Sequence, residues 1–210
     1  MTLADIVEEY LKYYAPKGER YLQYYKIQRT LDKAIDKSAL AVLPSGKRFS
    51  HQHRIPPSVL LEAKDALLRK KADLRICRTF DELYQMVTQI IDPIHGIGEL
   101  TIYDTAHRIG AYLKLEPEYV YLHAGTRAGA KALNLGSKSK KLTKAELPPE
   151  FQKLSPDQIE DCLCIFEAEL AALKIGKRMV LRKWKGKCKG SLKKLGCRSV
   201  DEYLKYTRGR

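Results

Sequence analysis

The sequence lacks the features that mark membrane proteins and secreted, disulfide-bonded proteins. None of its apolar runs approaches the ~18 residues that a membrane-spanning helix needs. Its first residues form an acidic, amphipathic pattern, which is unlike a secretory signal. The five cysteines are an odd and small number, and this argues against a disulfide framework. We therefore expect a soluble, cytoplasmic protein with no membrane partner.

Motifs for cofactor binding or catalysis are missing as well. There is no Walker loop, no Ser-His-Asp order and no paired-carboxylate motif. The cysteines contain no Cys-x-x-Cys spacing, and no third metal ligand is evident beside His51 and His53. These histidines lie in a loop with Lys47, Arg48 and Arg54, for which a phosphate contact is the better interpretation. We expect neither a metal nor a cofactor.

Acidic residues are scarce in a chain that is rich in basic ones. The 210 residues include 39 Lys and Arg against 25 Asp and Glu, a formal charge of +14. No acidic residue occurs between Glu169 and Asp201, where eleven Lys and Arg are found. Such a charge favours a polyanionic partner, DNA in the first place and RNA as the alternative. The residues of this stretch that we expect to contact nucleic acid are Lys183, Trp184, Lys185 and Lys187, although Trp184 has core packing as its alternative role.

Helical periodicity dominates the chain, and strand signals are sparse. We predict an all-α fold, a multi-helix orthogonal bundle with a basic C-terminal extension. Residues 1–136 are expected to form a helical core and residues 137–154, rich in Ser, Lys and Pro, a linker. Residues 155–210 are expected to hold an amphipathic helix and the basic segment. Within the core, the pattern predicts helices over residues 2–14, 18–36, 57–68, 80–91, 99–113 and 125–133.

The most informative segment lies within residues 83–113. An apolar helix ends at Asp92-Pro93, the turn Gly96-Ile97-Gly98 follows, and a second amphipathic helix begins at once. Glycines permit positive φ and leave no Cβ between the backbone and an approaching group. Amides at the start of the second helix would then form an anion site for one phosphate, with Ile97 packed inward. The alternative is a turn that merely joins two packed helices.

Further residues are assigned to the same predicted phosphate site. Thr101 lies in the first turn of the second helix, and Arg108 lies two turns further on. Arg127 and Lys131 are one turn apart on a later helix and so share a face of it. Solvent-exposed charges without a ligand are the alternative interpretation for the three basic residues.

The Gly-x-Gly segment resembles the helix-hairpin-helix motif, whose hairpin binds duplex phosphates without reading sequence. Further along, Val120-Tyr121-Leu122-His123 resembles the Val-Asp-x-His segment of helix-hairpin-helix DNA glycosylases of the endonuclease III type. Here Tyr121 stands at the position of the catalytic Asp, and Leu100 stands where lyase members carry a lysine. The cysteine cluster of that family's iron–sulfur site is also missing. The resemblance therefore implies a fold and a DNA-facing surface rather than a reaction.

Three hypotheses follow from the sequence. The leading one is a non-catalytic protein that binds duplex DNA without sequence preference, through the hairpin and the Lys/Arg-rich tail. The second is a glycosylase-like repair enzyme with a displaced catalytic carboxylate, for which Glu118 is the candidate; its alternative role is that of a first-turn helix acid. The third is an RNA-associated basic protein.

Overall fold

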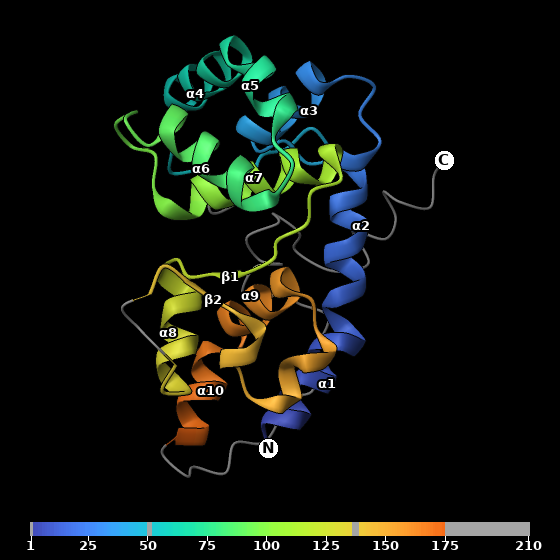
Figure 1. The fold of residues 1–210 in the computed structure, drawn as a ribbon, viewed down its shortest axis with the longest axis vertical. Coiled ribbons are helices and arrows are strands. Elements are labelled where there is room, and N and C mark those ends of the chain that lie inside the picture. The colour runs from blue at the N-terminus through green and yellow to red at the C-terminus, as the bar shows by residue number, and fades with distance from the viewer. Residues whose placement is uncertain (1, 50–51, 136–138, 175–210) are drawn as a thin grey trace. The chain divides into compact units, whose positions relative to one another are not determined.

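The structure of the protein, a computed structural model, describes residues 2–49, 52–135 and 139–174 (Figure 1). This part of the chain is mostly helical and contains one two-stranded sheet, so the predicted all-α class is confirmed. Within these same ranges, no helix is long and apolar enough to cross a membrane. The expected basic C-terminal extension begins where the described residues end.

The chain forms two compact units, and the second is an insertion into the sequence of the first. Of the residues that the structure describes, Glu19–Pro117 form the second unit, and those before Glu19 and after Pro117 form the first. This division differs from the expected boundaries at residues 136 and 154. The expected linker contributes Leu142, Phe151 and Leu154 to the core of the first unit, where each is at most 2% exposed.

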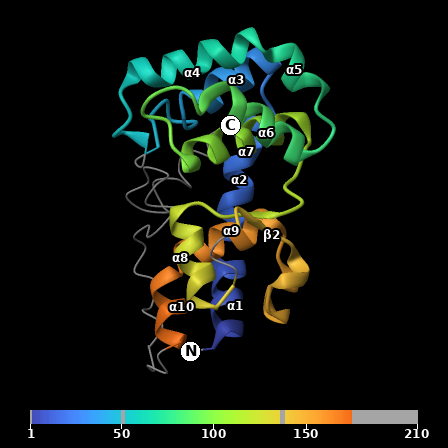
Figure 2. The same cartoon turned by 60° about the vertical axis from the view of Figure 1, so that its left-hand side comes forward.

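The second unit is a cluster of helices around one long central helix (Figure 2). Its elements are the end of α2 (Ala15–Lys26), α3 (Leu31–Ala39), α4 (Pro57–Arg69), α5 (Lys71–Ile76), α6 (Phe80–Ile91) and α7 (Glu99–Leu113). Helix α7 packs against both α3 and α6. Its apolar residues Ile102, Ala106 and Ile109 recur at helical spacing and are almost fully buried, which places α7 in the core of this unit.

The helix expected over residues 18–36 is broken into two. Helix α2 ends at Lys26, and α3 begins at Leu31 after Thr30, whose hydroxyl accepts a hydrogen bond from the Lys33 amide at 3.2 Å. Ile27, an apolar residue that lies between the two helices, is 64% exposed. A side-chain cap at Thr30 thus starts a new helix within what looked like one periodic stretch.

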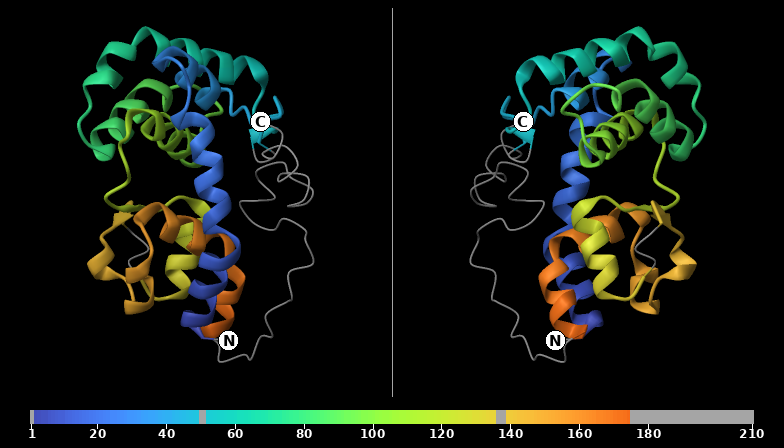
Figure 3. Two further views of the ribbon diagram at one scale, coloured as in Figure 1. Left: turned by 90° about the vertical axis from the view of Figure 1, so that its right-hand side faces the viewer. Right: turned by 90° about the vertical axis from the view of Figure 1, so that its left-hand side faces the viewer.

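The first unit combines short helices with the small sheet (Figure 3). Its elements are α1 (Leu3–Tyr13), β1 (Val120–Tyr121), α8 (Ala124–Ala132), β2 (Lys141–Leu142), η2 (Lys144–Glu146), η3 (Pro149–Lys153), α9 (Pro156–Ile165) and α10 (Glu167–Lys174). The strands are antiparallel, with Val120 opposite Leu142. Helix α8 packs against α9 and α10. The approach of α8 to α9 is close, because a Cβ at Gly129 would lie 2.2 Å from the Leu163 carbonyl oxygen.

Candidate nucleic-acid interface

Residues 92–98 connect α6 to α7, and we call this segment the α6–α7 turn. Helix α6 ends where the Asp92 amide donates to the Thr88 carbonyl at 2.9 Å. Two further bonds reverse the chain, from the Ile94 amide to Ile91 and from the Ile97 amide to Ile94, each at 3.1 Å. Ile94 is 9% exposed and anchors the turn in the core. Ile97, expected to do this, is only half-buried.

The two glycines of the turn are in different conformations. Gly96 has φ of +95°, in the left-handed region where residues with a Cβ are strained. Gly98 has φ of −120° and ψ of 169°, which is extended backbone that any residue adopts. A Cβ at Gly98 would also meet nothing within 4 Å. The backbone of the turn therefore requires glycine at position 96 and does not require it at position 98.

Gly98 is the N-cap of α7, and no side chain caps this helix. By contrast, Thr2, Thr30 and Thr79 each accept a hydrogen bond from an amide of the helix that follows them. Gly98 is exposed. The N-terminus of a helix carries a partial positive charge and amide groups directed away from the helix, so that an uncapped and exposed N-terminus can accommodate an anion.

Thr101 does not belong to the surface of the turn. Its side chain is on the inner side of α7 and the residue is 7% exposed, while its amide donates to the Gly98 carbonyl at 2.8 Å. The expectation that Thr101 contacts a ligand directly is therefore wrong, because its hydroxyl lies within the fold. Its backbone helps to hold Gly98 at the start of the helix.

Arg108 is likewise an internal residue and does not flank the turn at the surface. It is 2% exposed, and its guanidinium lies 4.3 Å from the centre of the Phe49 ring. It donates to the Tyr21 hydroxyl, to the Ser38 carbonyl and Gln52 Oε1 at 3.2 Å each, and to Asp104 Oδ2 at 3.1 Å. The prediction of a phosphate contact is wrong for Arg108, because its donors are committed to partners inside the second unit.

The charge of this internal arginine is maintained by its neighbours. Burial by itself would lower the pKa of Arg108, but Tyr21 and Asp104 outweigh burial and raise that pKa. Burial raises the pKa of Tyr25 to about 12, against the opposing effect of Arg108. The network thus holds a guanidinium cation among neutral tyrosines and one carboxylate, an arrangement that connects α7 to α2, to α3 and to the loop before α4.

The remaining predicted contacts of the described chain belong to the first unit. Arg127, on α8, donates to the Leu122 carbonyl at 2.8 Å and to the Ser139 carbonyl at 3.2 Å, so it ties together two segments of that unit. Lys131 is exposed one turn later on the same helix. Glu118, the candidate for a catalytic carboxylate, is exposed just before β1. Of the residues predicted to form one phosphate site, only Gly96, Ile97 and Gly98 lie together on the α6–α7 turn in the described part of the chain.

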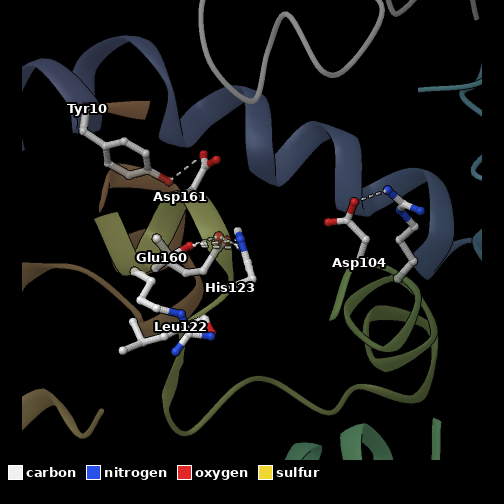
Figure 4. Close-up of polar contacts among 9 residues, drawn as sticks. Tyr10, Asp104, Leu122, His123, Glu160 and Asp161 are labelled. Atoms are coloured by element: carbon white, nitrogen blue, oxygen red, sulfur yellow. Dashed lines mark hydrogen bonds and ion pairs between the residues drawn. The ribbon is translucent and has the colours of Figure 1, made fainter. Parts of the chain in front are cut away.

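The sequence did not single out a buried polar cluster in the first unit (Figure 4). His123 Nε2 is hydrogen-bonded to Glu160, and Thr126 donates to the same Glu160 Oε1 at 2.8 Å. All three residues are at most 9% exposed. The cluster joins the start of α8 to α9. A signal existed in the buried face of α9, where Glu160 lies beside the apolar positions Ile159 and Leu163.

Neighbouring polar groups of α9 are also internal. Tyr10 donates to Asp161 Oδ2 at 3.3 Å, and burial raises the pKa of Tyr10 well above its usual range. Burial also raises the pKa of the Cys162 thiol, which disfavours the thiolate that binds metals. No group of three or more His, Cys, Asp or Glu side chains that could hold a metal ion occurs in the described ranges.

The tail residues Lys183, Trp184, Lys185 and Lys187 lie outside the described residues. No protein-family profile, curated protein or solved structure matches this chain.

Proposed function

We propose that this protein binds duplex DNA without reading its sequence, and that the α6–α7 turn is its phosphate contact. The proposal has two sources in the sequence, the resemblance of residues 83–113 to the helix-hairpin-helix motif and the formal charge of +14. In this proposal the Lys/Arg-rich tail, residues 174–198, adds long-range attraction for the polyanion.

One observation carries the proposal: the fold does not require a glycine at position 98. With ordinary φ and open space where a Cβ would lie, Gly98 could be a capping Thr, as Thr2, Thr30 and Thr79 are at the starts of α1, α3 and α6. A residue without a side chain leaves the first amides of α7 accessible to a group from outside. A phosphate oxygen fits this position, because it accepts hydrogen bonds and carries the charge that a helix N-terminus favours.

The decisive experiment compares Gly98→Asp with the matched control Gly18→Asp. Both positions have open space for a side chain and both changes add one negative charge. An aspartate at position 98 would cap α7 and repel phosphate, so we expect duplex affinity to fall by about tenfold or more while stability rises slightly. The control is expected to lose far less affinity. The measurement is fluorescence anisotropy with a 20-base-pair duplex of arbitrary sequence, together with thermal unfolding.

The same assay identifies the result that would refute the proposal. If the wild-type chain does not bind the duplex even at low salt, the proposed function is wrong. If Gly98→Asp and Gly18→Asp reduce affinity equally, DNA binding stands and the α6–α7 turn is not its contact. Tighter binding of structured RNA than of duplex DNA at matched salt would indicate the RNA-associated class instead.

A further inference from the structure

The α6–α7 turn has a basic neighbour within the second unit. A Cβ built on Gly96 would lie 3.7 Å from Cγ1 of Val59, so the turn lies against the first turn of α4. The chain that leads into α4 carries four basic residues, which we call the basic segment: Lys47, Arg48, His53 and Arg54. All four lie in the loop that joins α3 to α4.

Hydrogen bonds hold the basic segment together. Arg48 Nη1 donates to the Ile55 carbonyl at 3.1 Å, and His53 Nε2 lies 2.8 Å from the Arg48 carbonyl, a position in which the ring N–H donates. Gln52, which is fully buried, accepts from Arg108 at 3.2 Å. The segment is thereby fixed to α7, the helix that begins at Gly98. The turn and the basic segment therefore share two supports, α4 through Val59 and α7 through Arg108.

The chain from the end of α3 to the first turn of α4 carries only basic charge. Residues 37–61 contain no Asp or Glu. Lys47, His53 and Arg54 are exposed, and Arg48 is half-buried with its guanidinium bonded to a backbone carbonyl. Exposed Lys and Arg side chains of this kind bind phosphate oxygens and release the counterions that surround a duplex.

We propose that the basic segment is a second phosphate contact of the second unit, beside the α6–α7 turn. This inference rests on the proposed function and makes it more specific. Lys47 and Arg54 bind backbone phosphates of the same duplex whose phosphate is bound at Gly98. Because the contacts are to the backbone, the affinity that they contribute is independent of base sequence and falls steeply with salt.

The test neutralises Lys47 and Arg54 together and compares the result with another pair in the same unit. The control is Lys33→Gln with Arg69→Gln, one exposed lysine and one exposed arginine. Lys33 is next to Asp32 in the sequence, and Arg69 is two residues before Lys71. Asp32 and Lys71 form an ion pair at 2.9 Å that joins the start of α3 to α5. The control pair therefore lies near the C-terminal end of α4, whereas Val59 lies near its N-terminal end. Both double variants lose two positive charges and keep their apolar cores.

The readout is the slope of log affinity against log salt for a 20-base-pair duplex. We expect Lys47→Gln with Arg54→Gln to reduce the magnitude of this slope by about 1.8 and the affinity by about tenfold per cation at 0.1 M salt. The control pair is expected to leave the slope within error of the wild type. Helical circular dichroism and the urea midpoint of each variant check that the fold is retained.

Each outcome separates this inference from the proposed function. Equal slopes for both double variants would overturn the basic segment as a contact, and a loss of affinity in Gly98→Asp alone would leave the proposed function standing. Loss of affinity in the Lys47/Arg54 variant but not in Gly98→Asp would support the basic segment and overturn the contact at the turn. Absence of wild-type binding would refute both.

Discussion

A glycine and an arginine of the first unit occupy environments opposite to those of a glycine and an arginine of the second. In the first unit, Gly129 is packed so closely that a Cβ would lie 2.2 Å from a backbone oxygen, and the nearby Arg127 is partly exposed. In the second unit, Gly98 has open space around it, and Arg108 is buried. Glycine is thus packed against the core at position 129 and exposed in a turn at position 98, whereas arginine is partly exposed at position 127 and buried at position 108.

This contrast shows how a glycine can be interpreted. The glycines of α8, at positions 125 and 129, are explained within the chain, because a Cβ there would meet Cys164 and Leu163 respectively. Gly98 has no such neighbour, because a Cβ there would meet nothing within 4 Å.

The largest effect is expected at the buried arginine. Arg108→Ala removes a partner of Asp104 and the donor to the buried Gln52 side chain, so we expect a loss of about 3–5 kcal/mol of stability. Arg127→Ala in the first unit is the control, with an expected cost of about 1 kcal/mol because its partners are two carbonyl groups at a half-exposed site. Urea unfolding measures both, and hydrogen exchange should report the loss in residues 19–117 for Arg108→Ala. Similar costs for the two variants would contradict the contrast.

The next effect is expected at the close contact between α8 and α9. Gly129→Ala forces α8 away from the Leu163 carbonyl, a backbone group that cannot rotate aside, and we expect a cost of about 3 kcal/mol. Gly18→Ala is the matched control, because this helical glycine has nothing within 4 Å of a Cβ and alanine is the better helix former by up to about 1 kcal/mol. The two urea midpoints should therefore shift in opposite directions. An unchanged midpoint for Gly129→Ala would contradict the close packing.

The smallest effects are expected in the α6–α7 turn. Gly96→Ala places a Cβ on a residue with φ of +95° and should cost about 1–2 kcal/mol. Gly98→Ala is compatible with the backbone, and its cost is expected to be about 0.5 kcal/mol because alanine is a poorer N-cap than glycine. Thermal unfolding of the two variants in the same buffer decides between them. An equal loss at both positions would show that the fold itself requires Gly98.

Much of the secondary structure could be predicted from periodicity and caps. Helix α1 begins after Thr2 and α6 after Thr79, as the sequence indicates, and α4 begins at the proline pair. The break before Thr30 could not be predicted from periodicity, because Ile27, Leu31 and Ile35 recur every four residues across it. The burial of the expected linker could not be predicted either, because it has few apolar residues among its Ser, Lys and Pro. These few residues, such as Phe151, are enough to join it to the core.

The candidate site was predicted in part. The position of the α6–α7 turn follows from its glycines and from Pro93, which are local signals. The location of Arg108 was not predictable in this way, because Ser38 and Gln52 lie 70 and 56 residues before it in the sequence. A basic residue on an amphipathic helix has the same pattern whether its partners are solvent or distant parts of the fold. Only the tertiary structure distinguishes the two.

The insertion of the second unit into the first has a consequence for synthesis on the ribosome. Helix α1 emerges first, but the strands and helices that complete its unit follow only after the whole of Glu19–Pro117, about 100 residues later. At 5–20 residues per second this delay is about 5–20 s, which is long compared with the folding time of a small helical domain. The inserted unit can therefore fold first, while the amphipathic α1 waits with its apolar face unpaired.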